Sequence, residues 1–277
     1  MSPPTISIIT PSLNQSRFLE ENIRSVLRQH YPAIEHIVVD GGSTDETLDL
    51  LKKSPHLRWI SEPDRGQAHA VNKGFRMATG EILGWINSDD GYCENILADV
   101  ARCFDDPAVM VVYGDGVEVD SDGNIIRSIV PRGITTEQFI KYWMWQYEYI
   151  QASFFFRRSV LVETGYLDES LFYTMDHDFF IRLSRRFRFH YLPKSLAFFR
   201  LHEASKTGAT HRSVIPRYIP ELHKVSMRYW GNPKQWRYYR HLFSFLGAIV
   251  FSLIKNVLFV PGSKSRAYVE RSMHRGK

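Results

Sequence analysis

The first 90 residues alternate between short apolar runs and amphipathic segments, and no other feature of the chain constrains its fold as strongly. Apolar, β-rich runs occupy residues 5–10, 34–40, 57–60 and 81–87. Helical patterns separate them, at residues 18–29, 46–53 and 68–78. Strands that alternate with helices of this length are typical of a parallel, doubly wound sheet. We therefore predict an α/β fold with a Rossmann-like, mostly parallel sheet.

A polar loop follows each predicted strand. These loops comprise residues 10–14, 40–45, 62–66 and 88–90. Ligands of open α/β sheets bind beyond the carboxyl ends of the strands. We therefore expect the four loops to converge on one crevice.

The alternation weakens after residue 91, where the pattern predicts a smaller, mixed sheet. We predict strands at residues 109–113, 151–157, 189–191 and 196–199. A hairpin is predicted over residues 116–129, with its turn at residues 122–124. Short helices are predicted at residues 159–164 and 179–187.

Two adjacent carboxylates, Asp89 and Asp90, follow Ser88 at the end of the fourth predicted strand. Neighbouring carboxylates repel each other, and a bound divalent cation removes that repulsion. Mg²⁺ or Mn²⁺ held there would bridge to diphosphate oxygens. Aspartates in turns also cap helices, so a structural role for the pair stays open.

Two further loops carry residues suited to a nucleotide. Asp40 ends the second predicted strand, where it can accept a hydrogen bond from a nucleobase or a ribose, or stabilise the turn before a helix that Asp45 caps. Gly66 permits close approach of a ligand to the backbone. Arg65, beside it, can meet a phosphate or remain a solvated surface residue.

Asp176 lies at the start of a predicted helix. A carboxylate there stays ionised, which suits a general base, although an N-cap is the structural alternative. His177 and Asp178 are expected to be structural or to face solvent. His202 alone would be assigned a structural role.

Five stretches of the chain resemble the family 2 glycosyltransferases and follow one another in that family's order between residues 6 and 206. They read ISIITPSLNQSRFLEENIRSVLRQHYP, EHIVVDGGSTDETLDLL, SEPDRGQAHAVNKGFRMATGEILGWINSDD, TMDHDFFIRL and FRLHEASK. The resemblance implies the GT-A fold. It also implies transfer of a sugar, with inversion, from a nucleotide-diphosphate donor to a hydroxyl acceptor, with Mn²⁺ or Mg²⁺ as cofactor.

The resemblance also assigns roles to residues of this chain. Asp176 would be the catalytic base, and Asp90 and His202 would bind the metal. The nucleotide and donor contacts would come from Thr10, Pro11, Asn14, Asp40, Gly41, Asp64, Arg65, Gly66 and Asp89.

The chain departs from the family pattern at two positions. Gly41 stands where many relatives have a second carboxylate, which leaves the nucleotide open. Met175 stands where relatives have glutamate before the catalytic aspartate. That change leaves Asp176 in place and removes an acidic neighbour.

These assignments divide the chain into a catalytic domain of residues 1–203 and a tail of residues 204–277. Residues 1–91 would form the nucleotide-binding half of the domain and residues 92–203 the acceptor half. The family and the tail together suggest an acceptor in cell-surface polysaccharide or glycolipid synthesis, free or lipid-linked. A catalytically inactive nucleotide-sugar-binding or membrane scaffold protein is the alternative. A nucleotidyltransferase is disfavoured, because the first loop lacks a Gly-rich, basic stretch for a triphosphate.

Charge separates the predicted tail from the rest of the chain. Residues 204–277 hold 14 Lys/Arg and 2 Asp/Glu, whereas the whole chain has a net charge of only +5. Residues 242–260 form the most apolar stretch of the chain. A basic, apolar tail favours a membrane surface over nucleic acid. Three alternatives remain for residues 242–260: an amphipathic helix in the plane of the membrane, a helix packed on the protein or in an oligomer, or a single span.

Residues 139–150, rich in aromatic side chains, would line the acceptor site, form an exposed patch or join the core. No basic and apolar leader precedes residue 5, and Cys93 and Cys103 match neither a zinc motif nor a disulfide framework. We expect a cytoplasmic protein, peripheral at the inner face of the plasma membrane.

Overall fold

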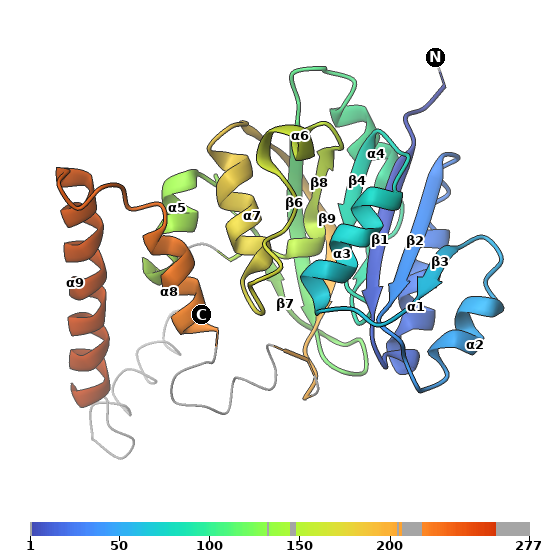
Figure 1. Ribbon diagram of the computed structural model, residues 1–277, viewed down its shortest axis with the longest axis horizontal. Coiled ribbons are helices and arrows are strands. Elements are labelled where there is room, and N and C mark those ends of the chain that lie inside the picture. The colour runs from blue at the N-terminus through green and yellow to red at the C-terminus, as the bar shows by residue number, and fades with distance from the viewer. Residues whose placement is uncertain (1, 132, 145–147, 204, 207–217, 259–277) are drawn as a thin grey trace, which may run out of the picture.

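A nine-stranded sheet forms the centre of the protein (Figure 1). The computed structural model describes residues 2–131, 133–144, 148–203, 205–206 and 218–258. The strands are β1 (Ile6–Ser12), β2 (Ile34–Asp40), β3 (Arg58–Ser61), β4 (Ile82–Trp85), β5 (Gly91–Tyr92), β6 (Val111–Val119), β7 (Ile125–Ile129), β8 (Phe154–Arg157) and β9 (Phe189–Arg200). The α-helices are α1 (Ser16–Leu27), α2 (Thr47–Lys52), α3 (Gln67–Met77), α4 (Leu97–Cys103), α5 (Thr136–Ile140), α6 (Val160–Thr164), α7 (Met175–Ser184), α8 (Ile219–Met227) and α9 (Trp236–Leu258).

The order of the strands brings most carboxyl ends to one edge of the sheet. That order is β3-β2-β1-β4-β8-β6-β9-β5, with β7 paired to β6. Strands β1 to β4 are parallel, and β8 runs antiparallel to both β4 and β6. Since β9 is parallel to β6, both strands run in the direction of β1 to β4. The mostly parallel sheet confirms the predicted α/β class.

Alternating side chains bury both faces of the sheet. Ile8 packs among side chains of α1 and α4, whereas Ile9 packs with those of α3 and α7 on the opposite face. Phe155 and its neighbour Phe156 divide between the same two clusters. Continuous apolar runs are therefore the expected sequence of these strands, because both faces are covered by helices.

The second half of the sheet differs from the prediction in several strands. Strand β5 was not predicted, β6 is continuous from Val111 to Val119, and β8 begins at Phe154 rather than at residue 151. Residues 189–191 and 196–199 were predicted as separate strands, but β9 is continuous from Phe189 to Arg200. Its register against β6 shifts between Leu192 and Ser195, so that Pro193 lies in an irregularity of the pairing. Proline has no N–H to donate to a neighbouring strand, and it is tolerated here because the pairing is irregular.

The C-terminal helices extend the molecule away from the sheet. In Figure 1, α5 and α8 lie between α7 and α9. No helix in the described part of the chain is long and apolar enough to cross a membrane. Residues 242–258 lie in α9, and residues 259–260 of the predicted apolar run lie outside the described residues.

Part of the aromatic segment 139–150 belongs to the core. Phe139, Ile140, Trp143 and Ile150 are buried. Residues 145–147 lie outside the described part of the chain. Cys93 and Cys103 are both free.

Candidate active site

The four polar loops meet at the carboxyl edge of the parallel strands, as predicted. The Asn14 N–H donates to Ser43 Oγ at 2.7 Å, and the Thr44 N–H donates to Asn14 Oδ1 at 2.8 Å. Gln67, at the start of α3, donates through Nε2 to Asn87 Oδ1 at 2.6 Å. The Glu62 N–H donates to the Asp40 carbonyl at 3.0 Å, which links these two pairs, so the loops after β1, β2, β3 and β4 form one surface.

Thr10 and Pro11 lie within β1 rather than in the loop after it. Thr10 is wholly buried, and its Oγ1 lies 3.0 Å from His36 Nε2. Burial lowers the pKa of His36 to about 3, so this histidine is neutral near pH 7. The Thr10 side chain supports the sheet behind the loops, and its contact with a nucleotide stays a prediction.

Asp40 is fully buried, and its carboxylate organises the turn after β2. One oxygen accepts hydrogen bonds from the Gly42 N–H (3.1 Å), the Ser43 N–H (2.9 Å) and Ser61 Oγ (2.6 Å), and the other accepts from Ser43 Oγ. Its acceptor capacity is thus largely used within the protein. This is the structural alternative that its sequence position left open.

The loop after β3 brings Asp64 against Gly41. A Cβ added at Gly41 would lie 2.6 Å from Asp64 Oδ2, so the Asp64 carboxylate occupies the space that a side chain at position 41 would need. Asp64 Oδ1 accepts from the Gly66 N–H at 2.7 Å, and Gly66 has a φ of 117°. Arg65 pairs with Glu169 at 2.5 Å on the surface.

The turn after β4 separates its two carboxylates. Asp89 Oδ2 lies 3.0 Å from His202 Nε2. Asp90 is buried, and its oxygens accept from the Arg200 N–H at 3.0 Å and from Asn87 Nδ2 at 3.2 Å. Burial, and then the charge of Asp89, raise the pKa of the Asp90 carboxyl well above its usual range. The carboxylate that faces His202 is therefore Asp89.

Arg200, at the end of β9, holds this turn in place. Its side chain is almost wholly buried and donates to the Asp89 carbonyl at 3.1 Å, to the Asp120 carbonyl at 3.3 Å and to Glu21 at 2.6 Å. The sequence placed Arg200 beside His202 without assigning it a role. The fold gives it one, because it links the turn to α1 and to the β6–β7 hairpin.

Replacing Arg200 with methionine is expected to lower the free energy of unfolding by about 3 kcal/mol, because several buried carbonyl groups lose their donor. The measurement is urea denaturation followed by circular dichroism. Arg102→Met is the matched control, since Arg102 is exposed and its pairing with Asp99 within α4 contributes little. Equal stability losses in both variants would contradict this role.

Asp176 lies in the first turn of α7, as predicted. Its Oδ1 accepts from the His177 N–H at 2.8 Å. Burial raises the pKa of Asp176 to about 6, although the charge of Lys206 partly opposes this. Burial therefore outweighs the helix N-terminus, which alone would keep the carboxylate ionised.

The neighbours of Asp176 are structural, as expected. His177 is buried, its Nδ1 lies 3.2 Å from the Tyr149 hydroxyl, and burial lowers its pKa to about 4. Asp178 is buried and pairs with Arg182 at 2.8 Å. Met175, at the position of the family's glutamate, packs in the hydrophobic core.

Residues that the sequence did not single out complete this edge. Glu221, in α8, accepts from the Tyr173 N–H at 2.6 Å and from the Thr174 N–H at 2.8 Å, which fixes the chain before α7. Lys206 Nζ donates to Gln67 Oε1 at 2.8 Å. Only the position of Lys206, four residues after His202 in a polar loop, could have indicated its involvement.

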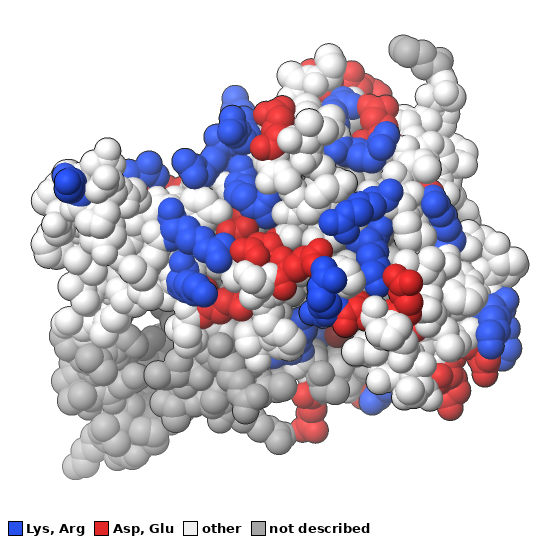
Figure 2. All heavy atoms as spheres, in the orientation of Figure 1, with Lys and Arg blue, Asp and Glu red and all other residues white. Residues whose placement is uncertain are grey.

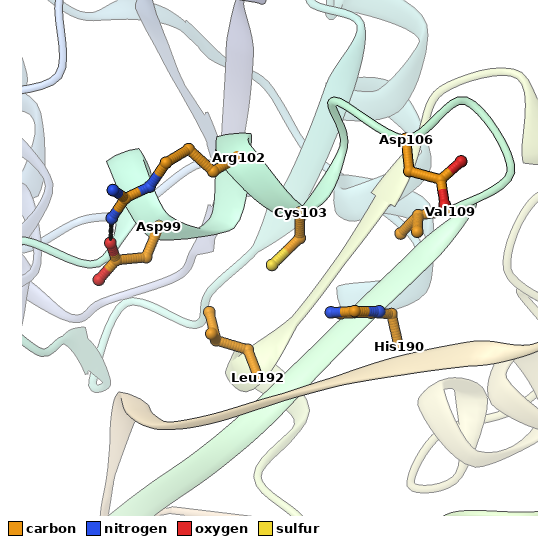
Figure 3. A pocket seen from close by; sticks show the side chains of 7 residues that line it. All are labelled: Asp99, Arg102, Cys103, Asp106, Val109, His190 and Leu192. Atoms are coloured by element: carbon orange, nitrogen blue, oxygen red, sulfur yellow. Dashed lines mark hydrogen bonds and ion pairs between the residues drawn. The ribbon is translucent and has the colours of Figure 1, made fainter.

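The described surface has other features away from this edge. Figure 2 shows acidic and basic side chains interleaved over the middle of the visible face. Figure 3 shows a pocket between α4 and the start of β9, lined in part by Asp99, Cys103 and His190. This pocket lies at the amino end of β9, whereas His202 follows its carboxyl end.

A mostly parallel sheet with carboxylates at its carboxyl edge and a mixed second half defines a GT-A-like fold. The chain belongs to the glycosyl transferase family 2, whose profile matches residues 7–165. An uncharacterized glycosyltransferase of Mycobacterium tuberculosis is 30% identical over 190 residues, which cover 65% of this chain and 69% of that protein.

Two solved structures share the fold. Residues 1–349 of TarS from S. aureus, in complex with UDP-GlcNAc, superpose with a TM-score of 0.68 at 21% identity, covering 93% of this chain and 76% of that one. The mannosyltransferase PcManGT from Pyrobaculum calidifontis, in complex with GDP-Man and Mn²⁺, gives a TM-score of 0.59 at 18% identity, covering 99% of this chain and 80% of that one. The predicted family and the predicted GT-A fold are thereby confirmed.

Proposed function

We propose that this chain transfers a sugar from a nucleotide-diphosphate donor to a hydroxyl acceptor, with inversion at the anomeric carbon. One observation carries the proposal: at the carboxyl edge of the sheet, Asp89 Oδ2 lies 3.0 Å from His202 Nε2, and Lys206 donates to Gln67, directly after the loop of Asp64 and Gly66. A candidate metal site and a candidate nucleotide contact therefore lie at one edge. The nucleotide complexes of the two structural neighbours support the same class of donor.

We assign the candidate metal site to Asp89 and His202 rather than to Asp90. A carboxylate oxygen and an imidazole nitrogen 3.0 Å apart fit Mn²⁺ or Mg²⁺ as two protein ligands, with diphosphate and water completing the shell. The described residues contain no group of three or more His, Cys, Asp or Glu side chains that could hold a metal ion. When bound, the metal would neutralise charge on the leaving diphosphate.

We assign the base to Asp176. A carboxyl with a pKa of about 6 is ionised at pH 7 and is a stronger proton acceptor than an exposed aspartate. It would accept the acceptor's hydroxyl proton while that oxygen attacks the anomeric carbon opposite the diphosphate.

We assign the nucleotide to the surface formed by Asn14, Gly41 and the loop of Asp64, Arg65 and Gly66. Asp64 would replace the carboxylate that Gly41 lacks, because it occupies that space. Thr10, Pro11 and Asp40 would act behind this surface by holding the loops.

The test is a panel of nucleotide sugars that starts with UDP-GlcNAc and GDP-Man, with Mn²⁺ or Mg²⁺. Nucleoside diphosphate release that depends on an added acceptor supports a transferase, and excess EDTA is expected to stop it. A scaffold protein would bind a donor without turning it over. Failure to bind any donor would refute the proposal.

We further propose that α9 binds an anionic membrane surface, which would place the enzyme at the inner face of the plasma membrane, near a polysaccharide or glycolipid acceptor. One face of α9 packs on the core through Leu242, Phe245 and Ala248. The other face exposes a stripe of large apolar side chains, Trp236 (74%), Tyr239 (41%), Phe243 (59%), Leu246 (46%) and Val250 (54%). The upper part of the surface over α9, at the left of Figure 2, shows little charge on the visible face.

Charge around this stripe favours anionic lipid. Residues 218–258 contain six Lys/Arg and one Asp/Glu, and Arg237 and Arg240 lie at the start of α9. Basic residues beside an exposed apolar stripe are typical of helices that lie in the membrane interface.

The Phe243→Ser, Leu246→Ser double variant is expected to bind phosphatidylserine-containing vesicles at least about tenfold more weakly in sedimentation. It lacks two apolar side chains that membrane binding would bury in the lipid. Val162→Ser, at an apolar side chain that is 89% exposed on α6, is the control. If the wild type instead forms dimers through α9 and ignores vesicles, the stripe is an oligomer contact and this proposal is wrong.

A further inference from the structure

Lys206 is the central cation of the candidate site, yet no ion pair within the described residues uses its charge. Its Nζ donates to Gln67 Oε1 at 2.8 Å and to the Phe172 carbonyl at 2.9 Å, and lies 4.1 Å from the centroid of the Phe172 ring. Both acceptors are neutral. They fix the position of the ammonium group without neutralising it.

Two features at the start of α3 suit an anionic ligand beside Lys206, whose charge the carboxylates of Asp64, Asp89, Asp176 and Glu221 also attract. Gln67 opens α3, and the N-terminus of α3 has no side-chain cap. Beside it, Gly66 leaves open space where a Cβ would lie. Gln67 also donates to Asn87, which donates to Asp90, so Lys206 is tied to the turn that carries Asp89. An oxyanion between Asp89 and the start of α3 would therefore lie beside this ammonium group.

We propose that Lys206 binds the phosphate of the nucleotide diphosphate that is attached to the sugar, and that it stabilises this phosphate as it leaves. The proposal rests on the proposed function. When the bond between the anomeric carbon and the phosphate oxygen breaks, its electron pair stays on that oxygen. The terminal phosphate thereby gains negative charge. A fixed cation in a partly desolvated site is most effective against charge that appears in this way.

A lysine suits this task better than a rigidly paired arginine. Its ammonium is a compact charge on a flexible stem, so it can exchange Gln67 or Phe172 for a phosphate oxygen without moving the backbone. The alternative is that Lys206 is only a brace between the segment after His202 and α3. The two roles differ in which part of a nucleotide they affect.

The experiment compares Lys206→Met, Lys206→Arg and the control Lys194→Met. Lys194, in the middle of β9, pairs with Asp99 of α4 at 2.5 Å. The probes are UDP with UMP, and GDP with GMP, each measured by calorimetry and as inhibitors of transfer. Lys206→Met is expected to weaken diphosphate binding about 10- to 100-fold, as expected for one charged hydrogen bond, and to leave monophosphate binding within about twofold.

The remaining outcomes distinguish phosphate binding by Lys206 from a purely structural role. Lys206→Arg should recover most of the diphosphate affinity, and Lys194→Met should resemble the wild type. Equal loss of diphosphate and monophosphate binding in Lys206→Met would overturn the assignment and identify a structural role. The same conclusion would follow if Lys206→Arg lost diphosphate affinity together with a lower melting temperature. If the wild type transfers sugar and Lys206→Met is unchanged, only this inference fails. If the wild type binds no nucleotide, the proposed function fails with it.

Discussion

The Asp176→Asn variant is expected to lose sugar transfer by a factor on the order of 100 to 10,000, the range that a general base contributes. The amide cannot accept the acceptor's proton. Nucleotide binding should persist, because the Asp176 side chain accepts a hydrogen bond from the His177 N–H, which an amide oxygen can also accept. The measurements are single-turnover transfer and calorimetric binding of the donor.

Glu163→Gln is the control for this variant, because Glu163 lies in the first turn of α6 and its loss removes the same charge. An Asp176→Asn enzyme with wild-type turnover would show that the base lies elsewhere. If the turnover of Asp176→Asn is unchanged, Asp176 is excluded as the base even when the product is inverted.

The pH profile tests the same residue without a substitution. Burial raises the pKa of Asp176 to about 6, and the carboxyl must be deprotonated to accept a proton. The ratio kcat/KM should therefore be level above pH 6 and fall about tenfold per pH unit below it. A profile that stays level down to pH 4.5 would contradict this assignment.

Asp89→Ala and Asp90→Ala are expected to fail in different ways. Asp89→Ala should lower metal-supported transfer on the order of 1,000-fold, because charge stabilisation by a bound metal contributes several kcal/mol. Its stability should change little, since within the described part of the chain the Asp89 carboxylate contacts the His202 ring alone. Asp90→Ala should instead lower stability by about 1–3 kcal/mol, because the buried Arg200 N–H loses its acceptor.

Thermal denaturation with and without Mn²⁺ distinguishes the two carboxylates directly. We expect the metal to raise the melting temperature of the wild type and of Asp90→Ala, but not of Asp89→Ala. The opposite pattern would return the metal to Asp90, as the family resemblance implied.

The strands and helices of the first 90 residues could be predicted because each pattern is local. Strand β2 was predicted with its observed bounds, Ile34–Asp40, and α3 within a residue at each end. Strand β9 could not be predicted as one strand, because a proline at position 193 indicates the end of a strand. Only the pairing with β6 on both sides of Pro193 shows that the strand continues. Helices α4, α5 and α8 were missed, since they are short and their packing partners are distant in the sequence.

The site was predicted in its parts but not in its pairings. The sequence located Asp89, Asp90, Asp176 and His202 in polar loops. It could not show that His202 turns to Asp89, because 113 residues separate the two. Nor could it show that the Asp40 carboxylate accepts its hydrogen bonds mainly from its own turn, or that Asp64 fills the space at Gly41. These facts depend on how neighbouring loops pack, and no periodicity encodes that.

The position of β8 has a consequence for synthesis on the ribosome. Strands β1 to β4 emerge together, but the free edge of β4 is covered only by β8, whose residues 154–157 follow much later. At roughly 5–20 residues per second, the nascent chain carries an unpaired, apolar strand edge for several seconds. Residues 82–85 are therefore the segment where chaperone binding or misassembly of the growing chain should concentrate.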